Sequence, residues 1–133
     1  MRFSFLLKAS VSSIAMILAV GCASISGAPE TPEQSVKVRA QERWNALLAG
    51  QFDKAYEYIT PAGRSTLPIS LFRGRISGGS WHAATVTEVV CEAEVCDVTV
   101  ALNIDVLPNL PHQQKASEKW ILVDGKWWII YRG

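Results

Sequence analysis

The 133-residue sequence is poor in the features that mark many metalloenzymes, nucleotide-binding proteins and nucleic-acid-binding proteins. Its two histidines and three cysteines lack the spacing of a zinc site, so no metal is expected. It contains neither a G-x-S-x-G nucleophile elbow nor a P-loop, and no cofactor is expected. The 13 Lys and Arg residues are scattered, without a basic cluster interleaved with aromatic residues. This distribution argues against a nucleic-acid partner.

The sequence also lacks a convincing membrane-spanning segment, which would need about 20 apolar residues. The apolar run over residues 11–20 has roughly half that length and follows the positive charges of Arg2 and Lys8. A basic segment followed by a short apolar run is typical of an export signal. We therefore predict a signal peptide over residues 1–21.

The signal ends in Ala19-Val20-Gly21-Cys22, which resembles the lipobox of bacterial lipoproteins. That resemblance implies acylation of Cys22, cleavage before it, and a membrane anchor facing the periplasm. A plain secretory signal with an accidental cysteine is the alternative. Ala23, by resemblance to the sorting rules of enteric bacteria, favours the outer membrane of the cell envelope. Residues 22–31 are small and polar and predict a flexible tether, which leaves residues 32–133 as one domain.

Use of Cys22 for lipid leaves one cysteine pair, Cys91 and Cys96, in an oxidising compartment. A metal clip would need two more ligands, and only His82 and His112 are available. A redox pair would read C-x-x-C at a helix start, whereas this pair is C-x4-C among β-forming residues. The pattern favours a structural disulfide that clamps a hairpin.

Helices are expected in the first half of the domain. Thr31 to Gln34 form a capping box, and Gly50 ends the first helix. Its apolar face is predicted to hold Val36, Ala40, Trp44, Leu47 and Leu48, with Lys37, Arg39, Glu42 and Arg43 largely off it. A second helix capped by Asp53 is expected to end at Thr60-Pro61, and a third to span residues 68–76.

From Trp81 the hydrophobic period changes to two, which predicts a hairpin of residues 81–91 and 96–106. If Cys91 opposes Cys96, the numbers of opposed residues sum to 187 along the ladder. The core face would then comprise Trp81, Ala83, Thr85, Thr87 and Val89 with Val98, Val100, Leu102, Ile104 and Val106. His82, Glu88, Asp97, Thr99, Asn103 and Asp105 would face water. A β-bulge in either strand would reverse this facing.

A second hairpin is predicted around Asp124-Gly125, after a loop LPNLPHQQ over residues 107–114. Unlike the first hairpin it is apolar on both faces. One face holds Trp120, Leu122, Trp127 and Ile129, and the other holds Ile121, Trp128 and Ile130. Two apolar faces imply a central position, a covering helix or a partner, and large apolar patches usually meet another protein.

The two halves together resemble the nuclear transport factor 2-like superfamily. The stretch W-x-A-L-x-x-G-x-F-x-x-A-Y is carried by Trp44, Ala46, Leu47, Gly50, Phe52, Ala55 and Tyr56. The closing hairpin pattern is carried by Trp120, Leu122, Gly125, Trp128 and Ile130. The resemblance implies an α+β cone, in which N-terminal helices pack on a strongly curved, mainly antiparallel sheet that often encloses a pocket. Some relatives are isomerases or dehydratases, and many are binding or accessory domains.

Two functional hypotheses follow. The first is a non-catalytic domain that binds a small apolar ligand, with a candidate pocket formed by Trp44, Tyr56, Trp81, Thr85 and Trp120, or that binds an envelope protein or a second copy through the sheet. The second is a small pocket enzyme that uses His82 and Asp105, which obey the sum of 187 and would form a cross-strand pair. On the solvent face such a pair would contribute only a few tenths of a kcal/mol.

Overall fold

The structure, a computed structural model, describes residues 30–107 and 110–133. Within them, four helices precede four strands. The helices are α1 (Pro32–Leu48), α2 (Phe52–Tyr56), α3 (Pro61–Thr66) and α4 (Ile69–Ile76), and the strands are β1 (Trp81–Glu92), β2 (Val95–Leu107), β3 (Leu110–Val123) and β4 (Lys126–Ile130). The predicted signal peptide, Cys22 and the tether as far as residue 29 lie outside the described residues. None of the helices in the described ranges has the length and apolar character needed to span a membrane.

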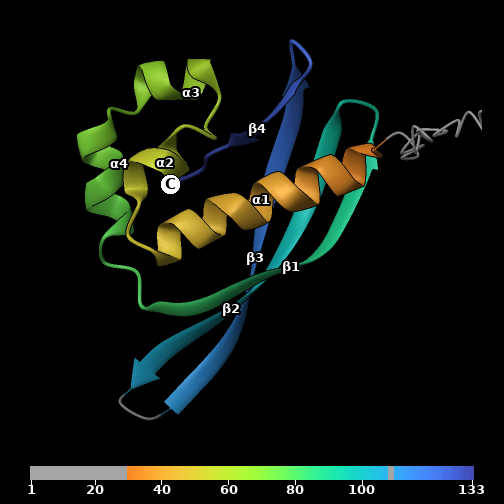
Figure 1. The fold of residues 1–133 in the computed structure, drawn as a ribbon. Helices are drawn as coiled ribbons and strands as arrows, with labels where there is room; N and C mark the ends of the chain where they lie inside the picture. Colours follow the sequence, from red (N-terminus) through yellow and green to blue (C-terminus); the bar gives the residue numbers. More distant parts are fainter. Residues whose placement is uncertain (1–29, 108–109) are drawn as a thin grey trace, which may run out of the picture.

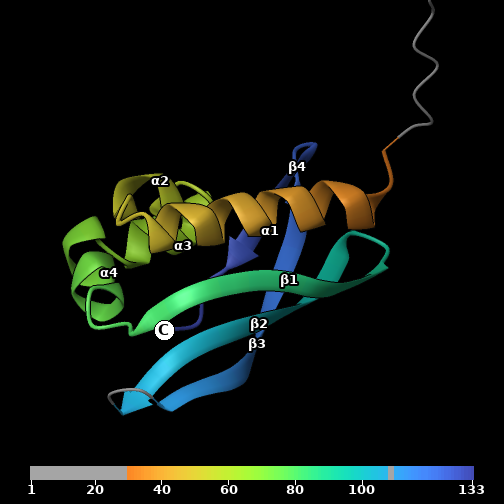
Figure 2. The ribbon, with the colours of Figure 1, turned by 60° about the horizontal axis from the view of Figure 1, so that its bottom comes forward.

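The strands form one antiparallel sheet in the order β1-β2-β3-β4. The sheet is curved, and α1 lies across one of its faces, while α2, α3 and α4 gather at one end beside the C-terminus (Figure 1). Figure 2 shows the far end of the β2–β3 hairpin extending away from the helices. The predicted α+β class, with N-terminal helices on a curved antiparallel sheet, is confirmed.

Local sequence signals explain both ends of α1. Thr31 Oγ1 accepts from the Gln34 amide, and the Gln34 side chain accepts from the Thr31 amide, which completes the capping box. At the other end Gly50 has a φ of 71°, and the amides of Gly50 and Gln51 donate to Leu47 and Ala46. These two bonds form a Schellman motif, so the predicted stop at Gly50 is confirmed.

The next segment differs from the prediction. Asp53 does not cap α2, which begins after Gln51, and instead forms an ion pair with Arg73 of α4. Thr60 caps a further short helix, α3, by accepting a hydrogen bond from the Gly63 amide. Pro61 therefore occupies the first helical position, where proline is favoured, instead of marking only the end of a helix.

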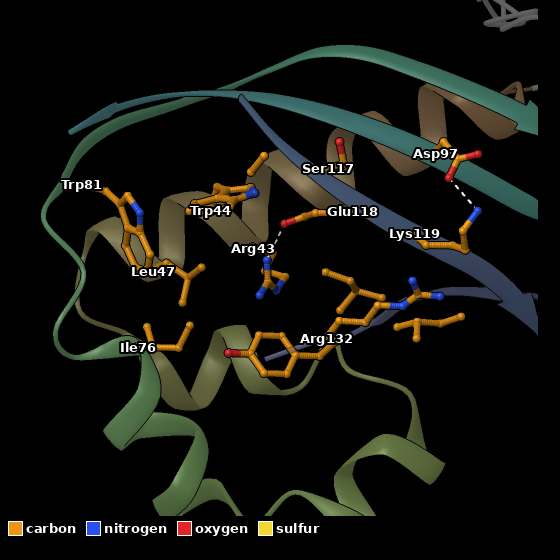
Figure 3. Close-up of a pocket in the computed structure, with 14 residues that line it drawn as sticks. Arg43, Trp44, Leu47, Ile76, Trp81, Asp97, Ser117, Glu118, Lys119 and Arg132 are labelled. Atoms are coloured by element: carbon orange, nitrogen blue, oxygen red, sulfur yellow. Dashed lines mark hydrogen bonds and ion pairs between the residues drawn. The ribbon is translucent and has the colours of Figure 1, made fainter. Parts of the chain in front are cut away.

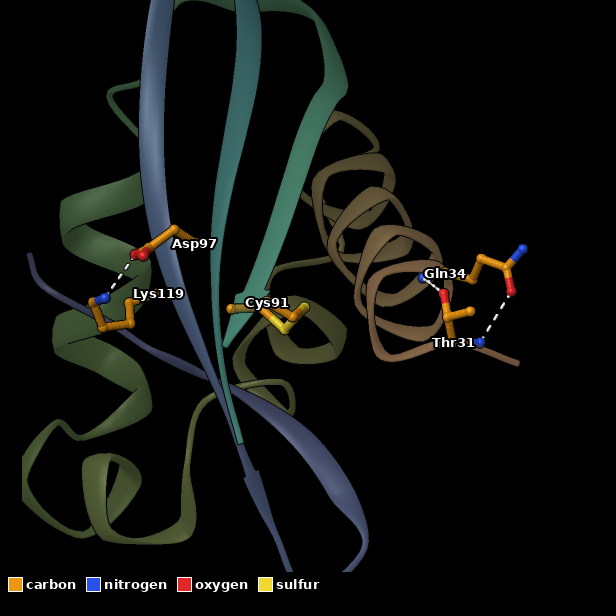
Figure 4. The surroundings of a disulfide bond; sticks show 6 residues. Thr31, Gln34, Cys91, Asp97 and Lys119 are labelled. Carbon is orange, nitrogen blue, oxygen red and sulfur yellow. Dashed lines mark hydrogen bonds and ion pairs between the residues drawn. A yellow bond between two sulfur atoms is a disulfide. The ribbon is translucent and has the colours of Figure 1, made fainter. Parts of the chain in front are cut away.

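The first hairpin carries the predicted disulfide. Cys91 and Cys96 face each other with Cα atoms 4.0 Å apart, next to the two-residue turn Ala93-Glu94 (Figure 4). β1 extends to Glu92 and β2 begins at Val95, so the connecting turn is shorter than the sequence predicted. Figures 1 and 2 place this turn close to the first turn of α1.

The register departs from the prediction away from the disulfide. The sum of 187 holds only as far as Glu88 and Thr99, and β1 then has irregularities at residues 86–88 and 81–83. As a result Ala84 and Val86 are buried, whereas Thr85 and Thr87 are exposed. The predicted core face of β1 is therefore wrong at Thr85 and Thr87, because a bulge moves side chains to the other face. Trp81, beyond the second irregularity, packs against the core as predicted.

On β2 the predicted face is largely correct. Val98, Val100 and Leu102 are buried, Ile104 is half-buried, and Val106 is exposed near the end of the strand.

The second hairpin turns at Asp124-Gly125, and both residues have positive φ, as this turn type requires. Its first face is confirmed as core: Trp120, Trp127 and Ile129 are buried, and Leu122 packs against them. The predicted loop is wrong at residues 110–114, which belong to β3 and pair with β2. The outer edge of β4 is bridged by Ile59, where the amide of Ile129 donates to the Tyr58 carbonyl.

Candidate functional site

A cavity of about 430 Å³ lies between α1, the middle of β3 and the chain just after β4 (Figure 3). Its apolar wall comprises Trp44, Leu47, Ile76, Trp81, Ala116, Ile129, Ile130 and Tyr131. Its polar lining comprises Arg43, Asp97, Ser117, Glu118, Lys119 and Arg132. The volume falls in the range of small-molecule sites, which are mostly apolar with a few placed polar groups.

The geometry of the sheet explains why a hollow remains here. β4 pairs with β3 only from Lys119 to Val123, and the chain after Ile130 no longer follows β3. Residues 116–118 of β3 therefore have no neighbouring strand on that side among the described residues. The side chains of α1, which cover this face of the sheet, leave the space beside residues 116–118 unfilled.

A buried ion pair forms one wall of the cavity. Arg43 is 3% exposed, and its Nη1 lies 2.8 Å from Oε1 of Glu118, whose side chain is 7% exposed. The second carboxylate oxygen of Glu118 accepts from Trp120 Nε1 at 3.0 Å. Glu118 and Trp120 are two residues apart on β3, so their side chains point to the same face. Glu118 thus joins the helix layer to the aromatic core.

The expectation that Arg43 lies off the apolar face of α1 is wrong. Val36, Ala40, Arg43 and Leu47 follow the spacing of one helical face, and all four are buried. Sequence reasoning missed Arg43 and Glu118 as a site because the partners are 75 residues apart. The available signal was a charged residue at a core position of α1, which demands a buried partner of opposite charge.

The electrostatics of Arg43 reflect incomplete compensation. Burial lowers the pKa of the Arg43 guanidinium, and the nearby Glu118 carboxylate opposes that shift. Arg43 Nε and Trp44 Nε1 are both buried without a hydrogen-bond partner in the described part of the chain. The cavity wall therefore contains more buried donors than acceptors, a situation that usually costs free energy.

Aromatic rings complete the apolar wall. The rings of Trp44 and Trp81 meet edge to face with centroids 5.5 Å apart. The Arg43 guanidinium lies 5.7 Å from the Trp44 ring and 6.0 Å from the Tyr131 ring. These contacts hold the guanidinium between two aromatic side chains, where cation–π attraction favours it.

The predicted pocket residues are only partly brought together. Trp44 and Trp81 line the cavity, whereas Tyr56, Thr85 and Trp120 do not. Thr85 is turned to solvent by the β1 bulge, and Trp120 is fully buried in the core. The Tyr56 hydroxyl donates toward the carbonyls of Arg64 and Leu67, and its ring packs on Phe72. Tyr56 therefore secures the α2–α4 region and not the cavity.

The predicted pair of His82 and Asp105 does form. His82 Nε2 lies 2.7 Å from Asp105 Oδ2, with side chains 58% and 49% exposed. Neither residue lines the cavity. Their environment is that of a solvated surface pair, which lacks the apolar surroundings used to tune catalytic groups. In the described ranges, no group of three or more His, Cys, Asp and Glu side chains could hold a metal ion.

The second apolar face of the β3–β4 hairpin is half-buried. Ile121, Trp128 and Ile130 retain partial exposure, and β4 is the last strand of the sheet, not a central one. Arg64 and Lys126 cover the Trp128 ring at 5.7 and 4.6 Å from its centroid. Cationic side chains thus lie over the aromatic member of the patch that the sequence suggested for a partner.

Comparison with known proteins supports the fold. No protein-family model matches the chain, and no curated protein matches it. Among solved structures, a putative NTF2-like transpeptidase from Campylobacter jejuni is similar, with a TM-score of 0.58 and 13% identity over 73% of this chain and 98% of that one. The solution structure of a SEC-C motif containing protein from Rhodopseudomonas palustris matches with a TM-score of 0.57 and 13% identity, over 69% of this chain and 72% of that one.

A SEC-C motif containing protein from Psychrobacter arcticus is also similar, with a TM-score of 0.58 and 10% identity over 73% of this chain and 60% of that one. At these identities the likeness concerns the fold alone. It supports the nuclear transport factor 2-like architecture that the two sequence motifs indicated.

Proposed function

We propose that this protein is a cell-envelope lipoprotein whose domain binds a small, largely apolar ligand in the cavity and does not catalyse a reaction. The observation that carries the proposal is the cavity itself: about 430 Å³, lined by the rings of Trp44, Trp81 and Tyr131 and by aliphatic side chains. Burial of a ligand's apolar surface there would contribute about 25 cal/mol per Å².

The lining favours binding over catalysis. Its two carboxylates are each engaged with a cation, Glu118 with Arg43 and Asp97 with Lys119. Neither is therefore placed as a free general base. The competing hypothesis of an enzyme uses His82 and Asp105, which lie outside the cavity and are well hydrated. The cavity offers a better place for a substrate-sized molecule than that surface pair does.

Native mass spectrometry of the purified full-length protein tests the proposal. We expect a co-purifying small-molecule adduct that is lost on mild activation. The variant Ala116→Trp should lose the adduct, because Ala116 lines the cavity and a large ring would fill it. Ala101→Trp is the matched control, because Ala101 lies on the neighbouring strand and its side chain points to the opposite face.

Equal adduct levels in both variants would place the ligand elsewhere, provided that circular dichroism shows both to be folded. A bare mass at dimer stoichiometry would instead favour a partner on the sheet face around Trp128, which the sequence also suggested.

The anchor is tested separately. We propose that Cys22 is acylated and holds the domain at the outer membrane, facing the periplasm, because two or more acyl chains give stable attachment. The parent protein should fractionate with membranes, and Cys22→Ser should appear in the soluble fraction. A membrane-bound Cys22→Ser variant would contradict the lipoprotein assignment while leaving the binding proposal intact.

A further inference from the structure

The charged lining of the cavity is unequal in sign. It contains three cationic side chains, Arg43, Lys119 and Arg132, and two carboxylates, Asp97 and Glu118. Glu118 pairs with Arg43 at 2.8 Å and Asp97 pairs with Lys119 at 2.6 Å. Within residues 30–107 and 110–133, Arg132 has no carboxylate within ion-pair distance. The cavity therefore carries one uncompensated positive charge.

The apolar and charged parts of the lining are separated. Figure 3 shows Trp81, Leu47 and Ile76 toward one side, and Lys119 and Asp97 toward the other, with Arg132 at the charged side. Arg132 is exposed, whereas Trp44, Leu47 and Ile76 are buried. A molecule that filled this cavity would meet aromatic and aliphatic surface along its body and a cation at its exposed end.

The buried part of the lining also favours a negatively charged ligand. Arg43 and Trp44 hold N–H donors without acceptors in the described chain, and one carboxylate only partly compensates the buried guanidinium. A negative charge in the cavity would stabilise Arg43 through the low local dielectric, even without direct contact with its buried Nε. A cationic ligand would be repelled by both arginines, and a neutral ligand would leave Arg132 unpaired.

We infer that the ligand is a small amphipathic carboxylate, whose acid group pairs with Arg132 at the rim while its apolar body packs on Trp44 and Trp81. This inference rests on the proposed function, that the cavity binds a ligand at all. A single carboxylate matches the single uncompensated charge, and the planar guanidinium fork can bind it through two parallel hydrogen bonds.

Three probes of nearly equal shape test the charge preference by isothermal titration calorimetry: 2-naphthoate, 2-naphthamide and 2-naphthylmethylamine. With the full-length protein in detergent, we expect 2-naphthoate to bind about tenfold more tightly than the neutral amide. The amine should bind more weakly than the amide. Added salt should weaken binding of the carboxylate and leave that of the amide unchanged.

Arg132→Gln should bring the affinity for 2-naphthoate down to that for 2-naphthamide and leave the amide unaffected. Folding is not at risk, because the Arg132 side chain is exposed. Lys115→Gln is the matched control: it removes an exposed cation from β3 that does not line the cavity, and both affinities should stay at the parent values.

The outcomes separate the two proposals. If all three probes bound with equal affinity and Ala116→Trp abolished the binding of all three, the preference for a carboxylate would be overturned. The proposal that the cavity binds a ligand would still stand. Tighter binding of the amine would overturn the preference for a carboxylate as well. Absence of binding by every probe would overturn both the carboxylate and the proposed function of the cavity.

Discussion

Two pairs of side chains join distant parts of this chain at nearly the same distance, and they differ in almost every other respect. Arg43 and Glu118 meet at 2.8 Å with side chains 3% and 7% exposed, whereas His82 and Asp105 meet at 2.7 Å with 58% and 49% exposed. Sequence reasoning found the exposed pair and missed the buried one. Distance alone therefore says little about which pair matters.

The two pairs differ in what can solvate their polar groups when the contact is broken. Water can solvate His82 and Asp105 if their contact is lost, so the contact adds little net free energy. Arg43 and Glu118 have no such alternative, because removal of either leaves a charge in the core. The buried pair also lines the cavity, so its effects extend to ligand binding.

The largest effect should come from breaking the buried pair. Glu118→Ala leaves Arg43 uncompensated and removes the acceptor of Trp120 Nε1, and should lower the free energy of unfolding by about 3 kcal/mol. Chemical denaturation monitored by tryptophan fluorescence measures this. Ser117→Ala, an exposed neighbour on β3, is the control and should change stability by less than about 0.5 kcal/mol.

A double variant sharpens the same point. Arg43→Met with Glu118→Leu removes both charges and should regain much of the stability lost by Glu118→Ala, because an apolar replacement of a buried pair is often neutral or stabilising. A double variant no more stable than Glu118→Ala would show that packing, and not the buried charge, dominates at this position.

Many features of the fold could be predicted from the sequence because they depend on hydrogen bonds and backbone angles of residues that are close together in the chain. The capping box at Thr31, the stop at Gly50 and the turn at Asp124-Gly125 each depend on residues within a few positions of one another. The disulfide was also predictable, because the C-x4-C spacing and the flanking β-formers suffice to place Cys91 opposite Cys96.

The features that were missed depend on partners far along the chain. The bulge in β1 lies beside Gln41 of α1, whose side-chain amide donates to the Ala84 carbonyl and accepts from the Val86 amide, both at 2.9 Å. The sequence of β1 itself contains no signal that predicts this contact with α1. The inward facing of Arg43 likewise depends on Glu118, so the two errors about the site share one cause.

The disulfide should have the second largest effect, and it acts on the hairpin that carries the exposed pair. Cys91→Ala with Cys96→Ala should lower the free energy of unfolding by about 2 kcal/mol, the chain-entropy estimate for so short a loop. Thermal unfolding of the parent under oxidising and reducing conditions should show a matching loss. A double variant that melts at the parent temperature would show that β1–β2 pairing holds the register without the disulfide.

A smaller effect is expected where α1 meets the bulge. Gln41→Ala removes two hydrogen bonds to the outer edge of β1 and should cost about 1 kcal/mol. Amide hydrogen exchange should be faster at Val86 and unchanged at Val98, which lies in the middle of the sheet. Gln113→Ala, an exposed glutamine on β3, is the control. Unaltered protection of Val86 would mean that the bulge is stable without the helix.

The smallest effect should come from the exposed pair itself. Asp105→Asn keeps the shape of the side chain, removes its charge, and should change the free energy of unfolding by less than about 0.5 kcal/mol. It should also leave 2-naphthoate affinity at the parent value, because Asp105 does not line the cavity. Glu118→Gln, the same change at the buried pair, should shift both quantities. If Asp105→Asn altered ligand affinity as much as Glu118→Gln, burial would not be the property that separates the two pairs, and the surface pair would have to be coupled to the cavity through β2.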